Sequence, residues 1–204
     1  MLFRGNGRLV AFSIFRGMNI EEQLIRQCIK GDRKAQIRLY DQCYSYMMSI
    51  CIRYCRDKQE AGARLNLAFL KILQHLQDYD SSGQFKAWVS KITLRSIIDE
   101  FRSQQKHYQT HVYQGQIVQE PELLNGAYNK LAAEIDIDHV MGLIQQHSNM
   151  DRQVFNLFAI DGYSHKEIAE LLNISEGTSK WHVHEARKKL KENLSKEYKT
   201  ASLK

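Results

Sequence analysis

The sequence predicts an all-α fold of two small helical domains joined by a flexible linker. Apolar residues recur at helical spacing through most of the 204 residues, in two stretches separated by one without such a period. The chain contains a single proline, a residue that interrupts helices, and this favours long helices. Its hydrophobic fraction of 43% is typical of a chain with a packed core, which excludes a disordered protein.

Four helices are expected in the first half of the chain. We expect them over residues 20–31, 32–54, 60–76 and 85–106, with a polar break over residues 78–83. Asp32 is the predicted N-cap of the second helix. The chain's four cysteines all lie in this half, and we expect buried free thiols rather than disulfides: Cys28, Cys43, Cys51 and Cys55.

The helical period fails between residues 108 and 130, a stretch that holds the only proline, Pro121. The expected organisation is an extension over residues 1–18, a domain over 19–107, a linker over 108–130, a domain over 131–198 and a basic tail over 199–204. The apolar run in the extension is short, ends directly at Arg16 and lacks a small-residue cleavage site, so we do not expect a signal peptide. The alternatives for residues 1–18 are an unstructured extension or a start at Met18.

The second half predicts a helix-turn-helix. Helices are expected around residues 137–144 and over 151–160, 166–172 and 178–194. Ser164 and Glu167 have the spacing of a capping box, and Asn173 stands where the turn requires a left-handed residue. The outward face of the last helix is polar, aromatic and basic: Thr178, Lys180, Trp181, His182, His184, Arg187 and Lys188. Such a helix fits the DNA major groove, although an ordinary αα-hairpin with a solvated face is the alternative.

Charge supports a DNA partner. The chain has a net charge of +6, and its last 27 residues contain eight Lys and Arg against three Glu. A basic surface favours association with a polyanion. The scattered histidines show neither the spacing of a metal site nor that of a nucleophile and its base, so we expect no enzyme, no metal and no cofactor.

The motifs of both halves resemble those of bacterial sigma factors of the short extracytoplasmic-function (ECF) group. In the second half the strings similar to region 4 are "R-x-V-F" at 152–155, "G-x-S-x-x-E-I-A" at 162–169, "I-S-x-G-T" at 174–178 and "A-R-x-x-L" at 186–190. In the first half the strings similar to region 2 lie at 31–40, 60–71 and 85–102. The order of these motifs across two domains is the strongest part of the resemblance.

This resemblance implies a transcription initiation factor that binds the clamp and flap of core RNA polymerase. Region 4 would recognise the −35 promoter element through Thr178, Ser179, Lys180, Trp181, His182, His184, Arg187 and Lys188. Region 2 would open the −10 element through Tyr79, Asp80, Ser81, Trp88, Lys91 and Arg95. The polymerase-binding set would be Arg64, Leu65, Asn66, Leu67, Phe69 and Leu70. For Trp88, a plain core role is the alternative that we favour.

The chain departs from the family pattern in the helix that would bind the polymerase clamp. Ala63, Asn66 and Leu67 stand where the family usually has an acid, Gln and Glu, so apolar contact would replace charge pairs. Gly62 also lowers helix propensity there, by about 1 kcal/mol. The resemblance further implies a cytoplasmic protein with an anti-sigma factor, often membrane-anchored, and no small-molecule substrate. The alternative function is a helix-turn-helix regulator that binds DNA without polymerase.

Overall fold

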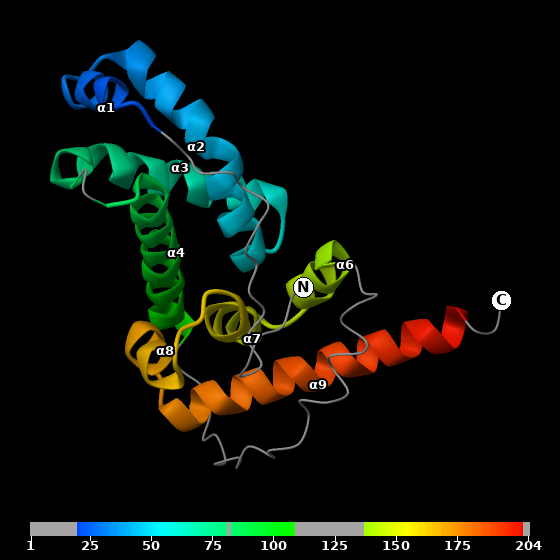
Figure 1. The fold of residues 1–204 in the computed structure, drawn as a ribbon. Coiled ribbons are helices and arrows are strands. Elements are labelled where there is room, and N and C mark those ends of the chain that lie inside the picture. The colour runs from blue at the N-terminus through cyan, green and yellow to red at the C-terminus, as the bar shows by residue number, and fades with distance from the viewer. Residues whose placement is uncertain (1–19, 81–82, 109–136, 202–204) are drawn as a thin grey trace. The chain divides into compact units, whose positions relative to one another are not determined.

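The computed structural model describes residues 20–80, 83–108 and 137–201, which Figure 1 shows. Every regular element in these ranges is helical, which confirms the predicted fold class. The helices form two compact units: an N-terminal unit within residues 20–108 and a C-terminal unit within residues 137–201. The predicted extension, all of the predicted linker after Tyr108, and residues 202–204 lie outside the described ranges, so the boundaries there stay predictions.

The N-terminal unit contains the helices that the periodicity predicts. They are α1 (Glu22–Ile29), α2 (Arg33–Tyr54), α3 (Lys58–Gln74), the 3₁₀ turn η1 (Leu76–Asp78) and α4 (Phe85–Tyr108). Asp32 caps α2 as predicted, because its carboxylate accepts hydrogen bonds from the backbone N–H groups of Lys34 and Ala35 at 2.9 and 3.2 Å. Asp57 caps α3 in the same way, through the N–H of Glu60 at 2.8 Å.

The core of the N-terminal unit lies where α2, α3 and α4 pack together. Fully buried side chains from these helices and η1 include Leu39, Met47, Tyr54, Leu65, Ile72, Leu76 and Val89. All four cysteines are buried free thiols, as predicted. Burial raises the pKa of Cys43 and of Cys51 to about 12, so neither thiol forms the reactive thiolate near neutral pH.

The C-terminal unit consists of α6 (Ile137–Gln145), α7 (Asn149–Phe155), the π-helical turn η2 (Asn156–Ile160), α8 (His165–Leu172) and α9 (Glu176–Ala201). In Figure 1, α8 lies against the N-terminal end of α9, which continues as one long helix. No described helix is both long enough and apolar enough to span a membrane.

The prediction of one α-helix over residues 151–160 is wrong in detail. The α-helix starts at Asn149, capped by Ser148, and becomes a π-turn after Phe155. The Asp161 N–H then bonds to the carbonyl of Asn156, five residues back, at 3.0 Å. The Asn156 side chain is fully buried and donates to the Arg152 carbonyl at 2.9 Å, an interaction that sequence periodicity does not reveal.

Buried polar groups are concentrated on α7. Arg152 is 2% exposed, and its guanidinium donates to the Gln145 carbonyl at 2.9 Å and to Asn149 Oδ1 at 3.0 Å. The first bond satisfies a carbonyl at the end of α6, where the helix itself supplies no donor. Arg152 therefore links the end of α6 to α7, which packs against the long helix α9.

Candidate nucleic-acid and polymerase interfaces

The helix-turn-helix is built from α8, a short turn and α9. Ser164 and Glu167 form the predicted capping box: the Glu167 N–H donates to Ser164 Oγ at 3.2 Å, and the Ser164 N–H donates to Glu167 Oε2 at 2.7 Å. Asn173 adopts the predicted left-handed conformation, with φ of 55° and ψ of 50°. Ser175 then caps α9, because its Oγ accepts from the Thr178 N–H at 2.9 Å. These local bonds fix the angle between the two helices.

Two predicted DNA-binding side chains are engaged within the turn and the core. The Thr178 hydroxyl lies 2.8 Å from Ser175 Oγ, so it belongs to the cap. Ser179 is completely buried, and its Oγ is hydrogen-bonded to His165 Nδ1 at 2.9 Å. The prediction that Ser179 contacts DNA is therefore corrected: its hydroxyl joins α9 to α8 inside the unit.

His182 faces inward rather than outward. Its Nδ1 lies 2.7 Å from Asp151 Oδ1, and the Lys189 ammonium lies 2.8 Å from Asp151 Oδ2. The Asp151 side chain is 3% exposed, and that of His182 is 13% exposed. Because this geometry occupies His182, we correct its predicted role from a DNA contact to a contact between α7 and α9.

The electrostatics of this cluster follow from its burial. Burial by itself would raise the pKa of the Asp151 carboxyl, but hydrogen bonds from His182, Lys189 and Ser148 outweigh it and hold that pKa well below its usual range. Nearby, His147 is 8% exposed, and neither ring nitrogen has a hydrogen-bond partner among the described residues. Burial lowers the pKa of the His147 imidazole, although the Asp151 charge opposes the shift.

The outward face of α9 retains the other predicted residues. Lys188 is exposed, and Lys180, Trp181 and His184 are partly exposed. The Arg187 guanidinium lies 5.5 Å from the centre of the Phe158 ring, which also stacks on His165 at 4.4 Å. This face therefore presents two lysines around an indole, and Arg187 lies at its edge.

The predicted −10 residues gather around an aromatic cluster in the N-terminal unit. Tyr79, Phe85 and Trp88 have ring centres 5.0–5.6 Å apart, and the Tyr79 hydroxyl donates to the Gly83 carbonyl at 2.6 Å. Trp88 is only half-buried, so the plain core role that we favoured for it describes only part of its side chain. Asp80 is exposed, and Ser81 lies outside the described residues.

Lys91 and Arg95 extend this surface along α4. Both side chains are exposed, and neither forms an ion pair with another residue that the structure describes. Trp88, Lys91 and Arg95 are spaced three and four residues apart, so they share one face of the helix. The result is an aromatic and cationic strip suited to single-stranded bases and their phosphates.

The predicted polymerase-binding set divides into internal and exposed residues. Leu65 is 0% exposed and Phe69 is 8% exposed, so both belong to the core, which corrects their prediction as contact residues. The Arg64 guanidinium is 13% exposed and lies 2.8 Å from the Glu100 carboxylate on α4. Arg64 thus joins α3 to α4, a role that its position in the motif did not suggest.

Leu67 and Leu70 remain as strongly exposed apolar side chains, at 48% and 53%. Asn66, exposed beside them, accepts a hydrogen bond from the Tyr40 hydroxyl at 2.9 Å. Tyr40 itself packs edge-on against Phe69 at 5.0 Å. Sequence reasoning missed Tyr40 as a member of this surface, because 26 residues separate it from Asn66.

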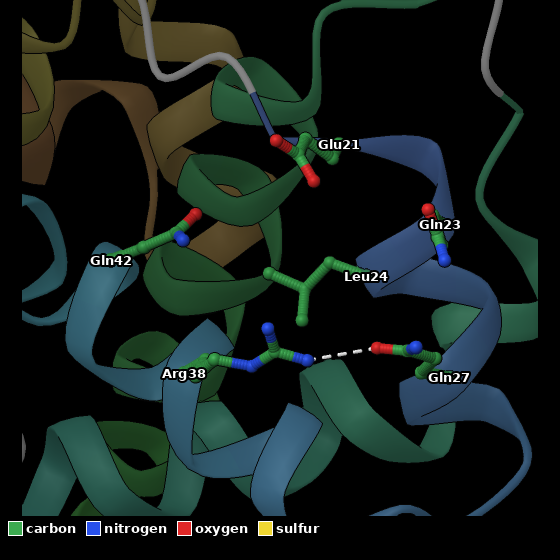
Figure 2. A pocket seen from close by; sticks show the side chains of 6 residues that line it. All are labelled: Glu21, Gln23, Leu24, Gln27, Arg38 and Gln42. Carbon is green, nitrogen blue, oxygen red and sulfur yellow. Dashed lines mark hydrogen bonds between the residues drawn. The ribbon is translucent and has the colours of Figure 1, made fainter.

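A polar hollow of about 310 Å³ lies between α1 and α2, and Figure 2 shows it. Its lining consists of Glu21, Gln23, Leu24, Gln27, Arg38 and Gln42. Arg38 donates to Gln27 Oε1 at 2.9 Å across it. None of the predicted site residues lines this hollow, so the candidate interfaces lie elsewhere. In the described residues no group of three or more His, Cys, Asp or Glu is placed to hold a metal ion.

Comparison with known proteins identifies both units. The model of the family Sigma-70 region 2 matches residues 39–107, and that of Sigma-70, region 4 matches residues 149–190, together more than half of the chain. The ECF RNA polymerase sigma factor SigW of Bacillus subtilis is 29% identical over 181 residues, which cover 83% of this chain and 94% of SigW.

The ECF RNA polymerase sigma factor SigM of the same species is 25% identical over 156 residues, covering 74% of this chain and 92% of SigM. The solved structure of CnrH in complex with the cytosolic domain of CnrY is 20% identical, covers 85% of this chain and 96% of CnrH, and gives a TM-score of 0.41. The family matches follow the order of the two helical units described above. The chain therefore belongs to the sigma-70 family of RNA polymerase sigma factors, in its ECF group.

Proposed function

We propose that this protein binds core RNA polymerase and directs it to specific promoters, with region 4 recognising the −35 element and region 2 melting the −10 element. The observation that supports this most is the presence of both sigma regions in one chain, in the expected order. A regulator acting without polymerase would not need a region 2, so we do not favour that alternative.

The −35 element would be bound by the outward face of α9. We assign this role to Lys180, Trp181, His184 and Lys188, with Arg187 at the edge. Thr178 stays in the set only through its place in the first turn of α9, because its hydroxyl is engaged in the cap. Lysines on this helix suit phosphate contacts, which position the helix in the groove without specifying sequence.

The −10 element would be opened at the surface formed by Tyr79, Trp88, Lys91 and Arg95, with Asp80 and Ser81 in the loop beside it. Aromatic faces stack on unpaired bases at about 1–3 kcal/mol per base, and cationic side chains follow the backbone. The half-buried Trp88, which contacts both Tyr79 and Phe85 in one cluster of three rings, provides such a face.

Core polymerase would be bound through Leu67, Leu70 and Asn66. Two leucines that are about half exposed on adjacent turns of one helix cost solvation free energy unless a partner covers them. Because Arg64 is paired with Glu100, we exclude it from the direct contacts. The clamp contact of this chain would therefore be mainly apolar.

Three further proposals follow from family membership. We propose an anti-sigma factor as a protein partner, and we propose that this partner is anchored in the membrane. We also propose that the protein acts in the cytoplasm, where RNA polymerase is found, and that it has no catalytic activity of its own. Co-purification from the native host under non-inducing conditions tests for the anti-sigma partner.

The decisive experiment for the main proposal is transcription in vitro with purified bacterial core polymerase. Promoters selected from a random duplex library by the reconstituted holoenzyme should give transcripts only when this protein is present. Leu70→Glu should weaken core binding at least tenfold, whereas Ile29→Glu, a comparable change at an exposed site on α1, should not. Absence of core binding, together with a footprint on duplex DNA by the protein alone, would overturn the proposal in favour of a polymerase-independent regulator.

A further inference from the structure

Trp181 stands at the centre of the outward face of α9. It precedes the buried Val183 by two residues, and at 100° per residue the two side chains lie about 160° apart around the helix. His184 and Lys188, three and seven residues later, project to the same side. Trp181 is thus the bulkiest side chain on the part of the helix that faces away from the unit's core.

The indole is held in place by a chain of contacts that begins on α7. Asp151, buried in the unit, is hydrogen-bonded to the His182 ring at 2.7 Å. The His182 and Trp181 rings in turn meet edge to face, with centres 4.8 Å apart and planes at 74°. A side chain supported in this way loses less conformational freedom when it binds, which favours tight and selective contact.

The chemistry around Trp181 indicates what it would meet. Lys180 and Lys188 lie on the same side of Trp181 around the helix and suit phosphates along one edge of a groove. Glu185, four residues on and partly exposed, would repel a phosphate placed directly over this strip. The strip therefore suits the floor of the major groove, where the one apolar feature of the base pairs is the C5-methyl group of thymine.

We propose that Trp181 recognises thymine methyl groups in the −35 element, and that His182 is a positioning residue which holds the indole against them. The proposal rests on the function given above, since it requires α9 to enter promoter DNA. In this proposal an apolar contact of Trp181 with DNA takes the place of the polar DNA contact predicted for His182.

The test uses the holoenzyme and the −35 site that it selects from random duplexes. We expect the selected site to contain a thymine that contacts Trp181. Replacing that thymine by deoxyuridine removes only the methyl group, and this should weaken binding about fourfold. Trp181→Ala should bind more weakly and no longer distinguish thymine from deoxyuridine. His184→Ala, on the same face, is the matched control and should keep the distinction.

The positioning role of His182 has its own measurement. In His182→Ala, the ratio of affinities for the thymine site and the deoxyuridine site should fall toward one, while the salt dependence of binding stays unchanged. His182→Gln, whose amide can still donate to Asp151, should restore part of this ratio. Unchanged thermal unfolding of Trp181→Ala would show that the region remains folded.

The outcomes separate this inference from the proposed function. Equal binding of the thymine and deoxyuridine sites by the wild-type holoenzyme, with transcription intact, would overturn the inference alone. So would a Trp181→Ala variant that keeps the discrimination but loses affinity for core polymerase, since the indole would then contact protein. Failure to select any site or to transcribe would overturn the proposed function and this inference with it.

Discussion

At the scale of single residues, Asp151 shows what sequence alone could and could not provide. The motif beginning at Arg152 was visible in the sequence, and it placed α7 correctly beside the helix-turn-helix. The partners of Asp151 were not visible, because His182 and Lys189 follow it by 31 and 38 residues. For the same reason, Arg64 was assigned to a surface although Glu100 holds it internally.

We predict that Asp151→Asn lowers the free energy of unfolding of the C-terminal unit by about 2 kcal/mol, because hydrogen bonds to a charged group contribute about 1.5–3 kcal/mol. Urea unfolding of the full chain, followed by tryptophan fluorescence, measures the change. Asp99→Asn is the control: its exposed pair with Lys71 at 3.2 Å should contribute under about 1 kcal/mol. Equal effects of the two substitutions would contradict the role given to the buried carboxylate.

His147 predicts a pH dependence. Because its pKa is lower in the folded than in the unfolded chain, the unfolded state binds more protons at acid pH. The stability due to the neutral imidazole is thus fully present above pH 6.5, the ordinary value, and decreases as the pH falls below it. The slope cannot exceed about 1.4 kcal/mol per pH unit for one proton.

Unfolding of His147→Leu between pH 7.5 and 5.5 checks this: the variant should lose less stability on acidification than the wild type. Gln146→Leu, at an exposed position just after α6 that carries no titratable group, should keep the wild-type slope. A wild-type slope that His147→Leu leaves unchanged would assign the pH dependence to other groups.

At the scale of helices, periodicity and capping chemistry predicted most of the fold. Asp32, the Ser164–Glu167 box and the left-handed Asn173 were all identified from residue type and spacing, because these bonds are local. The π-turn after Phe155 was not, since a pattern of apolar residues does not distinguish a π-turn from a continued α-helix. Burial of Leu65 and Phe69 likewise follows from which face of α3 meets α2 and α4.

Helix α3 allows a stabilising substitution. Gly62 lies inside this helix, and a Cβ placed there would meet nothing within 4 Å. Gly62→Ala should therefore raise the free energy of unfolding of the N-terminal unit by about 0.5–1 kcal/mol. Gly31→Ala is the contrasting variant and should destabilise, because Gly31 has a φ of +82° that alanine rarely adopts. Thermal unfolding measures both, and destabilisation by Gly62→Ala would contradict the open space assigned to this position.

At the scale of the whole molecule, the uneven distribution of charge is the main feature. Nearly all of the net charge of +6 can be attributed to the last 27 residues, which hold eight cationic residues and three glutamates. Folding modifies this picture, because Asp151 neutralises Lys189 within the C-terminal unit. The charges available to DNA are therefore fewer than the sequence suggests.

This distribution predicts how salt affects promoter binding. Each phosphate contact adds about 0.9 to the slope of log Kobs against log[salt], so Lys188→Gln should reduce that slope by about 0.9. Lys71→Gln, whose ammonium is paired with Asp99 on α4, should leave the slope unchanged. Binding of the holoenzyme to one promoter at 50–200 mM salt measures both slopes, and equal slopes for all three proteins would exclude Lys188 as a phosphate contact.

The two tryptophans of the chain are divided between its two units, which gives the protein a pair of built-in optical probes. Trp88 is in contact with Tyr79 and Phe85 in the N-terminal unit, and Trp181 lies beside His182 on α9. The tryptophan emission of a Trp88→Phe protein would come only from the C-terminal unit, and that of a Trp181→Phe protein only from the N-terminal unit. Stopped-flow fluorescence of these two proteins could therefore time the arrival of each unit on the promoter separately, without any attached dye.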